Sequence, residues 1–177
     1  VSELDAHRSR VSACFASLVL AGAGDVGRQR TAFEGLYAAG GDESALAQAL
    51  PDLAPVVRAD VVSQLLILRD SGYYRRLGES GRMRLQGLLA RLVAALERDE
   101  KADVVLRRAL AIIESIGART AYFALLNENP LAFARLVDVC RLGNFLSAQI
   151  AAHPLLLDEL VDTGLFDQSP SRRQTEE

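Results

Sequence analysis

Residues 85–96 read Leu-Gln-Gly-Leu-Leu-Ala-Arg-Leu-Val-Ala-Ala-Leu, and this stretch decides the fold class. Its large apolar residues recur every three or four positions, which is the spacing of one helical face. Arg91 and, just beyond the stretch, Glu97 lie off that face. Each such apolar face must be buried against another element. Two further segments repeat the pattern, the first with Val57, Val61, Leu65 and Leu68, and the second with Val105, Ala109, Ile112 and Ile116, widened by Leu106, Leu110 and Ile113.

The residues between these segments are typical of helix ends. Asp52 can accept hydrogen bonds from free amides ahead of a helix whose first turn accommodates Pro55. Asn129 is a capping residue placed directly before a proline, which suits the first helical position. Gly143 followed by Asn144 predicts the end of one helix and the cap of the next.

The sequence therefore predicts an all-α fold, an antiparallel bundle of about eight to ten helices. No window of five or more residues alternates apolar and polar side chains as a half-exposed strand would. The expected helices span roughly residues 3–20, 27–39, 43–50, 53–70, 80–98, 102–117, 119–127, 130–142, 144–152 and 154–162.

Length and composition indicate an ordinary globular chain. It has 177 residues and a mass of 19.1 kDa, half of its residues are hydrophobic, and its 13 glycines and 5 prolines are too few for a collagen-like or disordered chain. The net charge of −3 gives no electrostatic reason to expect a nucleic acid or a membrane as partner. Two cysteines, Cys14 and Cys140, cannot form a disulfide framework, so we expect free buried thiols and a cytoplasmic location.

The uncharged run 11–24, which follows Arg8 and Arg10, resembles a secretory signal peptide. Glu3 and Asp5 spoil the positive leader that such a peptide needs, and a run of this length is too short to cross a bilayer. We interpret it as part of a first helix. The chain starts with valine and becomes charged and helix-like at once, which indicates that it begins inside a longer protein.

The glycines at 22, 24 and 27 match the dinucleotide-binding pattern Gly-x-Gly-x-x-Gly. That site also needs a strand on each side of the following helix, the second ending in an acidic residue. Residues 36–41, which precede Asp42 and Glu43, are rich in alanine and glycine and do not have the composition of a strand. We therefore interpret residues 22–27 as a loop at the end of a helix.

Few residues suit catalysis. His7 and His153 stand in different segments, and His153 is interpreted as a polar helix end rather than a general base. Cys140 is in register with the apolar face of its helix, which predicts a core residue. Tyr73 to Arg76 could stack on and neutralise a phosphate, but two arginines on an acidic protein usually form a solvated helix end.

Near the C-terminus the sequence becomes specific. Residues 119–130 read Arg-Thr-Ala-Tyr-Phe-Ala-Leu-Leu-Asn-Glu-Asn-Pro, residues 136–140 read Leu-Val-Asp-Val-Cys, and residues 153–162 read His-Pro-Leu-Leu-Leu-Asp-Glu-Leu-Val-Asp. These segments resemble the bifunctional glutamine synthetase adenylyltransferase/adenylyl-removing enzyme family. In that family such motifs lie in a helical region between two nucleotidyltransferase domains. The resemblance is specific over residues 78–162 and looser upstream.

The resemblance implies a longer enzyme that transfers AMP from ATP to a tyrosine of glutamine synthetase with one domain and removes it by phosphorolysis with the other. Both domains of the family carry a Gly-Ser or Ser-Ser loop and an Asp-x-Asp pair that holds Mg²⁺ against the triphosphate. Neither occurs in this chain, and the pairs Asp99-Glu100 and Asp158-Glu159, taken as adjacent helical residues about 100° apart, cannot replace it. We therefore expect no catalytic, cofactor-binding or metal-binding residue here, and ATP and Mg²⁺ only in the longer enzyme.

Composition and the resemblance together suggest an organisation of the chain. Residues 1–22 are expected to be the end helix of the preceding domain, residues 23–52 a loosely packed connector, residues 53–166 the central helical bundle, and residues 167–177 a disordered tail. The leading hypothesis is a non-catalytic linker that positions and couples the two nucleotidyltransferase domains, with glutamine synthetase and the nitrogen-signalling PII protein as further partners. The alternative is an autonomous helical adaptor that docks through residues 73–76 or an apolar groove.

Overall fold

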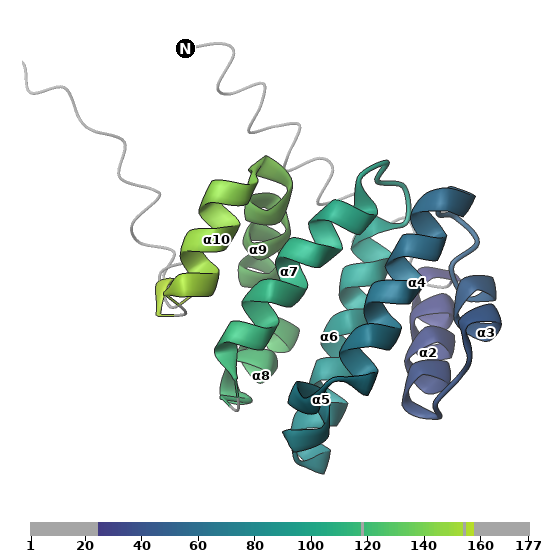
Figure 1. Ribbon diagram of the computed structural model, residues 1–177, viewed down its shortest axis with the longest axis horizontal. Coiled ribbons are helices and arrows are strands. Elements are labelled where there is room, and N and C mark those ends of the chain that lie inside the picture. Colours follow the sequence, from purple (N-terminus) through teal and green to yellow (C-terminus); the bar gives the residue numbers. More distant parts are fainter. Residues whose placement is uncertain (1–24, 118, 154, 158–177) are drawn as a thin grey trace, which may run out of the picture.

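The computed structural model describes residues 25–117, 119–153 and 155–157, without the side chains of residues 25–29. Over these residues the fold consists of nine helices and no strand, which confirms the all-α prediction (Figure 1). The helices are α2 (Asp25–Ala38), α3 (Glu43–Gln48), α4 (Pro55–Asp70), α5 (Gly72–Arg76), α6 (Glu79–Leu96), α7 (Ala102–Ile116), α8 (Ala121–Glu128), α9 (Pro130–Leu142) and α10 (Asn144–Ala152).

Most predicted helices are found with ends that differ by a few residues. The short helix α5 was not predicted, because five residues are too few to show a period. The predicted helix 3–20, the glycines at 22 and 24, and the tail 167–177 lie outside the described residues, as does most of the predicted helix 154–162. Residues 36–41 end α2 and form a turn, so no strand follows the glycine-rich motif.

The core is built on α6 and α7, which run in opposite directions because only residues 97–101 connect them. The large apolar residues of the 85–96 stretch are at most 3% exposed, as their spacing predicts. Helix α6 packs against α2 and α8, whereas α7 packs against α4, α9 and α10. The helices therefore follow one another across the molecule, with α2 and α3 at one end and α10 at the other (Figure 1).

Residues 30–50 pack more firmly than a loose connector would. Phe33 and Tyr37 are at most 2% exposed, their rings stack, and the Tyr37 hydroxyl donates to the Leu65 carbonyl at 2.8 Å. The glycines at 40 and 41 form a tight turn: Gly40 has a φ of +78°, and the Gly41 amide donates to the Leu36 carbonyl at 2.8 Å. The turn folds α3 back onto the core. The boundaries proposed at residues 22, 52 and 166 stay predictions.

The helix caps were predicted in part. The Asn129 side chain accepts from two amides of α9 at 3.1 Å, as expected. Asp52 does not cap α4; the cap is Ala54, because Pro55 is the first helical residue and forces the residue before it into an extended conformation. Gly143 does separate α9 from α10, but Asn144 is the first residue of α10 rather than its cap.

Gly81 in the first turn of α6 gives a test of how closely α6 approaches the start of α8. A Cβ atom there would lie 2.8 Å from Cγ2 of Thr120. We expect Gly81→Ala to lower the free energy of unfolding by about 1–2 kcal/mol, because the contact must be relieved by a shift. Gly87→Ala, in the same helix but with no atom closer than 3.7 Å, should raise it by about 0.5–1 kcal/mol. Urea denaturation measures both.

The control for this contact is Thr120→Ser, which removes Cγ2. In the Thr120→Ser background, Gly81→Ala should leave the free energy of unfolding almost unchanged. An equal cost in both backgrounds would contradict the proposed contact.

Candidate functional site

Helix α5 turns its tyrosines into the bundle. Tyr74 is 8% exposed, and its hydroxyl accepts from Gln86 Nε2 at 2.7 Å. The Tyr73 hydroxyl donates to the Ile113 carbonyl at 2.9 Å, and burial, aided by Glu114, raises the pKa of Tyr73 to about 12. The Tyr74 ring is therefore not available to stack on a phosphate, and the Tyr73 ring is only partly exposed. The interpretation of the two arginines as a solvated helix end is confirmed, since both are exposed.

The other polar residues singled out by the sequence do not converge. His153 is exposed, and its amide closes α10 by donating to the carbonyls of Gln149 and Ile150. Cys140 is fully buried in the core, as its register predicts. His7, Cys14, Asp158 and Glu159 lie outside the described residues.

Asp99 and Glu100 lie in the connection between α6 and α7 and not on a helix, which corrects their predicted placement. The Asp99 carboxylate is used in the fold: it accepts from the Lys101 amide and from Arg141 Nε, both at 3.0 Å. In the part of the chain that the structure describes, no group of three or more His, Cys, Asp or Glu side chains could hold a metal ion.

Arg91 makes the most developed polar contact between helices. Its Nη1 donates to the carbonyls of Leu126 and Asn127 at 2.7 and 2.6 Å, at the end of α8. The guanidinium also lies 4.3 Å from the centre of the Phe133 ring. Burial, aided by Arg30, lowers the pKa of Arg91. The cation is stabilised by the negative end of α8 and the face of an aromatic ring.

Several other polar side chains connect helices in the same way, by donating to a main-chain carbonyl of a neighbouring helix. Gln64 of α4 donates to the Asp103 carbonyl at 3.1 Å, and Asn127 of α8 donates to the Arg84 carbonyl at 2.8 Å. Arg108 of α7 donates to the Cys140 carbonyl at 2.7 Å. These bonds fix the position of one helix along its neighbour, which apolar packing alone specifies less strictly.

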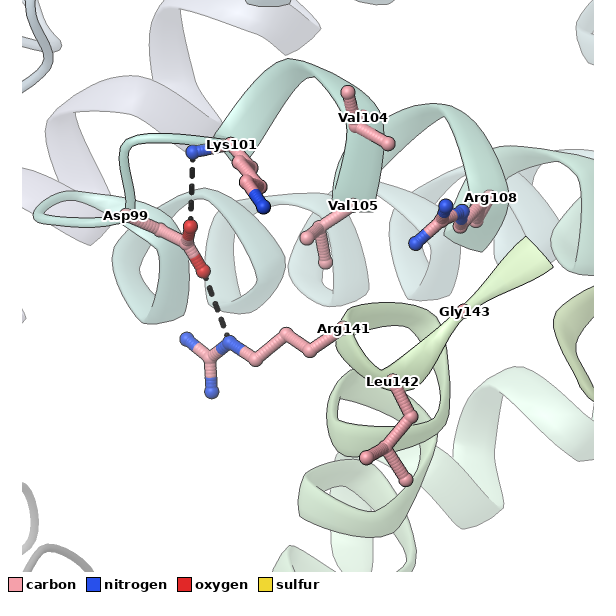
Figure 2. Close-up of a pocket in the computed structure, with 8 residues that line it drawn as sticks. All are labelled: Asp99, Lys101, Val104, Val105, Arg108, Arg141, Leu142 and Gly143. Carbon is pink, nitrogen blue, oxygen red and sulfur yellow. Dashed lines mark hydrogen bonds and ion pairs between the residues drawn. The ribbon is translucent and has the colours of Figure 1, made fainter.

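A groove lies where the start of α7 meets the end of α9 (Figure 2). It has a volume of about 410 Å³. We call it the basic groove, because three cations and one carboxylate give its lining a formal charge of +2. It is lined by Asp99, Lys101, Val104, Val105, Arg108, Arg141, Leu142 and Gly143.

The charge of the basic groove is suited to an acidic group. Arg141 is engaged, since it pairs with Asp99 and donates to the Ala95 carbonyl, both at 3.0 Å. Lys101 and Arg108 also face the groove (Figure 2). The first turn of α7 adds the positive end of a helix.

Sequence analysis did not identify Arg91 or the basic groove. Periodicity shows that Arg91 lies off the apolar face, but its partners are main-chain carbonyls, which carry no residue-type signal. The groove joins Lys101 to Arg141, which are far apart in the sequence and come together only when α7 packs on α9.

Comparison with known proteins identifies the relatives of the chain. It is 36% identical over 129 residues to a bifunctional glutamine synthetase adenylyltransferase/adenylyl-removing enzyme of Pseudomonas putida, a match covering 73% of the chain. The enzyme of the same name from Nitrosococcus oceani is 36% identical over 167 residues, or 91% of the chain, and that from Xanthomonas axonopodis is 43% identical over 98 residues. The chain belongs, as a segment, to this enzyme family. No family model matches it.

The chain spans only 10 to 17% of the length of these adenylyltransferase relatives. The described residues that carried the resemblance form α8, α9 and the end of the described chain. Three of them have structural roles: Asn129 caps α9, Thr120 lies against Gly81, and Cys140 is a core residue. Among the described residues no helix is long and apolar enough to span a membrane.

Arg91→Ala should destabilise the fold, because it leaves the two carbonyls at the end of α8 without their donor. We expect a loss of about 2–3 kcal/mol in the free energy of unfolding, and a smaller loss for Arg91→Lys, which keeps the charge but not the planar guanidinium. The matched control is Arg84→Ala on the same helix, whose side chain is exposed, with an expected change within about 0.5 kcal/mol. Equal effects of Arg91→Ala and Arg84→Ala in urea denaturation would contradict this role.

Cys140 should resist alkylation until the chain unfolds. Burial raises the pKa of its thiol from 9.0 to about 12, against a smaller opposing effect of Arg108. The thiolate is the reactive form, so at pH 8 its fraction should fall by about 10³. The measurement is the rate of reaction with iodoacetamide in a Cys14→Ser variant, with and without denaturant. A native rate close to the denatured rate would show that Cys140 is accessible.

Proposed function

We propose that the chain is a rigid spacer within a longer adenylyltransferase, which sets the relative position of the two nucleotidyltransferase domains that the family implies. The observation that carries the proposal is the set of side-chain-to-carbonyl bonds between helices, above all those of Arg91. A bundle whose helices are held in register can transmit a displacement from one end to the other as a unit.

In this proposal the nucleotide chemistry belongs to the flanking domains. The Asp-x-Asp pair that binds Mg²⁺ in the family does not occur in the sequence of this chain. The carboxylate of Asp99, which lines the basic groove, is already paired with Arg141. ATP and Mg²⁺ are therefore assigned to the longer enzyme, whose adenylylation and adenylyl-removing activities on glutamine synthetase the spacer would couple in the cytoplasm.

The test replaces the matching segment of the Pseudomonas putida relative, once by this chain and once by a glycine-serine segment of equal length. We expect the first chimaera to retain adenylylation and adenylyl removal together with their opposite regulation, that is, the control under which one activity rises as the other falls. The flexible chimaera should retain each activity but lose the opposite regulation, because a flexible linker cannot hold two domains at a fixed separation. Both activities are measured on glutamine synthetase.

Opposite regulation in the flexible chimaera would overturn the spacer proposal. AMP transfer by the isolated chain would also overturn it, since the chain would then carry the chemistry itself.

A second candidate is an adaptor that binds glutamine synthetase or PII directly, and the exposed Leu142 and Phe145 favour it, being 77% and 74% exposed. Calorimetry of the isolated chain with each partner separates the two candidates. Heat of binding with either would support the adaptor, and its absence with both would support the spacer.

A further inference from the structure

The end of the bundle at which α5 leads into α6 is rich in arginine. The arginines come from three parts of the chain: α5, the first two turns of α6, and the connection between α7 and α8. All of them are exposed. We call them the arginine cluster, which consists of Arg75, Arg76, Arg82, Arg84 and Arg119. Sequence analysis singled out only the first two.

The fold brings these three parts of the chain together. Only two residues separate α5 from α6. The hydroxyl of Tyr73 in α5 donates to the Gly117 carbonyl, just after α7, at 3.3 Å. Thr120, which follows Arg119, lies against Gly81 in the first turn of α6. Helix α5 and the end of α7 accordingly lie at the same end of the bundle (Figure 1).

The charge of the arginine cluster is not neutralised by pairing. Among the residues that the structure describes, none of the five arginines forms an ion pair with a carboxylate, whereas Arg141 does. Arg75 donates to the Asp70 carbonyl at 2.7 Å, and Arg82 donates to the Leu77 carbonyl at 3.0 Å. These acceptors are neutral, so they orient the two guanidinium groups without cancelling their charge and leave several of their five donors free.

Three carboxylates lie in the same part of the molecule. They are Asp70 at the end of α4, Glu79 in the first turn of α6 and Glu114 in the last turn of α7, and all three are exposed. Five arginines against three carboxylates leave an excess of two positive charges, on a chain whose net charge is −3. This end of the molecule therefore complements an acidic surface.

Met83 adds an apolar side chain to the arginine cluster. It lies between Arg82 and Arg84 in the sequence and is 58% exposed. Arginine and methionine are both enriched in contacts between proteins, where an apolar centre is surrounded by polar groups. We propose that the arginine cluster and Met83 form a docking surface for a partner protein with an acidic surface and an apolar side chain at its centre. This surface does not depend on the spacer role.

Two other acidic partners fit less well. Nucleic acids and anionic membranes are extended polyanions, and the domains that bind them through charge are strongly basic overall. This chain has a pI of about 5.5, so most of its surface would repel a polyanion that extends beyond the cluster. A partner protein needs to be acidic only where it touches the cluster.

The probe is a short synthetic peptide of glutamates with one central leucine, added to the isotope-labelled 177-residue chain. In NMR spectra it should shift the amide resonances of residues 72–84 and 119–121 and leave most others unchanged. The shifts should shrink as salt is added, because the attraction is electrostatic. The same peptide with glutamine in place of glutamate should cause none of these shifts.

Arg76→Glu and Arg119→Glu, made separately, test the charge. Within the described part of the chain neither side chain donates a hydrogen bond, so the fold should be kept. We expect each variant to raise the Kd for the peptide several-fold. The matched control is Arg98→Glu, an exposed arginine beyond the other end of α6, which changes the net charge equally and should leave the Kd almost unchanged.

Met83→Gln tests the apolar contact while leaving every charge in place. It should weaken binding of the leucine-containing peptide several-fold and leave binding of an all-glutamate peptide unchanged. An equal effect on both peptides would overturn the role of Met83.

Three results would overturn the docking proposal. The first is the absence of shifts at millimolar peptide. The second is an equal rise in Kd for Arg76→Glu, Arg119→Glu and the Arg98→Glu control. The third is tighter, cluster-dependent binding of duplex DNA or of phosphatidylserine vesicles, which would favour a nucleic acid or a membrane as the partner.

Discussion

The architecture depends on the need to cover α7 from two sides. Two sets of apolar residues lie on this helix, and their combined face is too wide for a single neighbour to bury. Val105, Ile112 and Ile113 are at most 3% exposed because α4 packs on one side and α9 and α10 pack on the other. The placement of the remaining helices follows from this arrangement. A short connection keeps α6 next to α7, and α2 and α8 pack against α6.

Polar contacts then select one alignment of the packed helices. Apolar faces of leucine, valine and isoleucine can slide along one another at modest cost, whereas a guanidinium over two particular carbonyls cannot. Arg91 donates to two such carbonyls between α6 and α8, and Arg108 donates to one between α7 and α9. In both cases the acceptors lie near the end of a helix, where carbonyls lack partners within the helix and carry its negative pole.

These two layers of interaction explain which features the sequence predicts and which it does not. The helices, their buried faces and the core position of Cys140 were predictable, because each depends on a local period. The inward tyrosines of α5 depend on neighbours that are distant in the chain. The failed cap at Asp52 depends on the steric effect of Pro55 on the residue before it. Contacts such as that of Arg91 with the end of α8 involve main-chain atoms. Every residue has these atoms, so no sequence pattern indicates which of them will be used.

The two ends of the bundle differ in how they are held, and this bears on the proposed spacer role. At the α2 end, an aromatic cluster and the Tyr37 hydrogen bond to α4 add to the packing. At the α10 end, the buried Ser147 hydroxyl bonds to the carbonyls of Gly143 and Asn144, at the start of its own helix, and Ile150 supplies apolar contact. Helix α10 is therefore positioned mainly by packing on α7 and α9, which resists separation better than sliding. In the proposed spacer role, a displacement carried through the bundle would pass beyond α10 undiminished only if the outer side of α10 were also held.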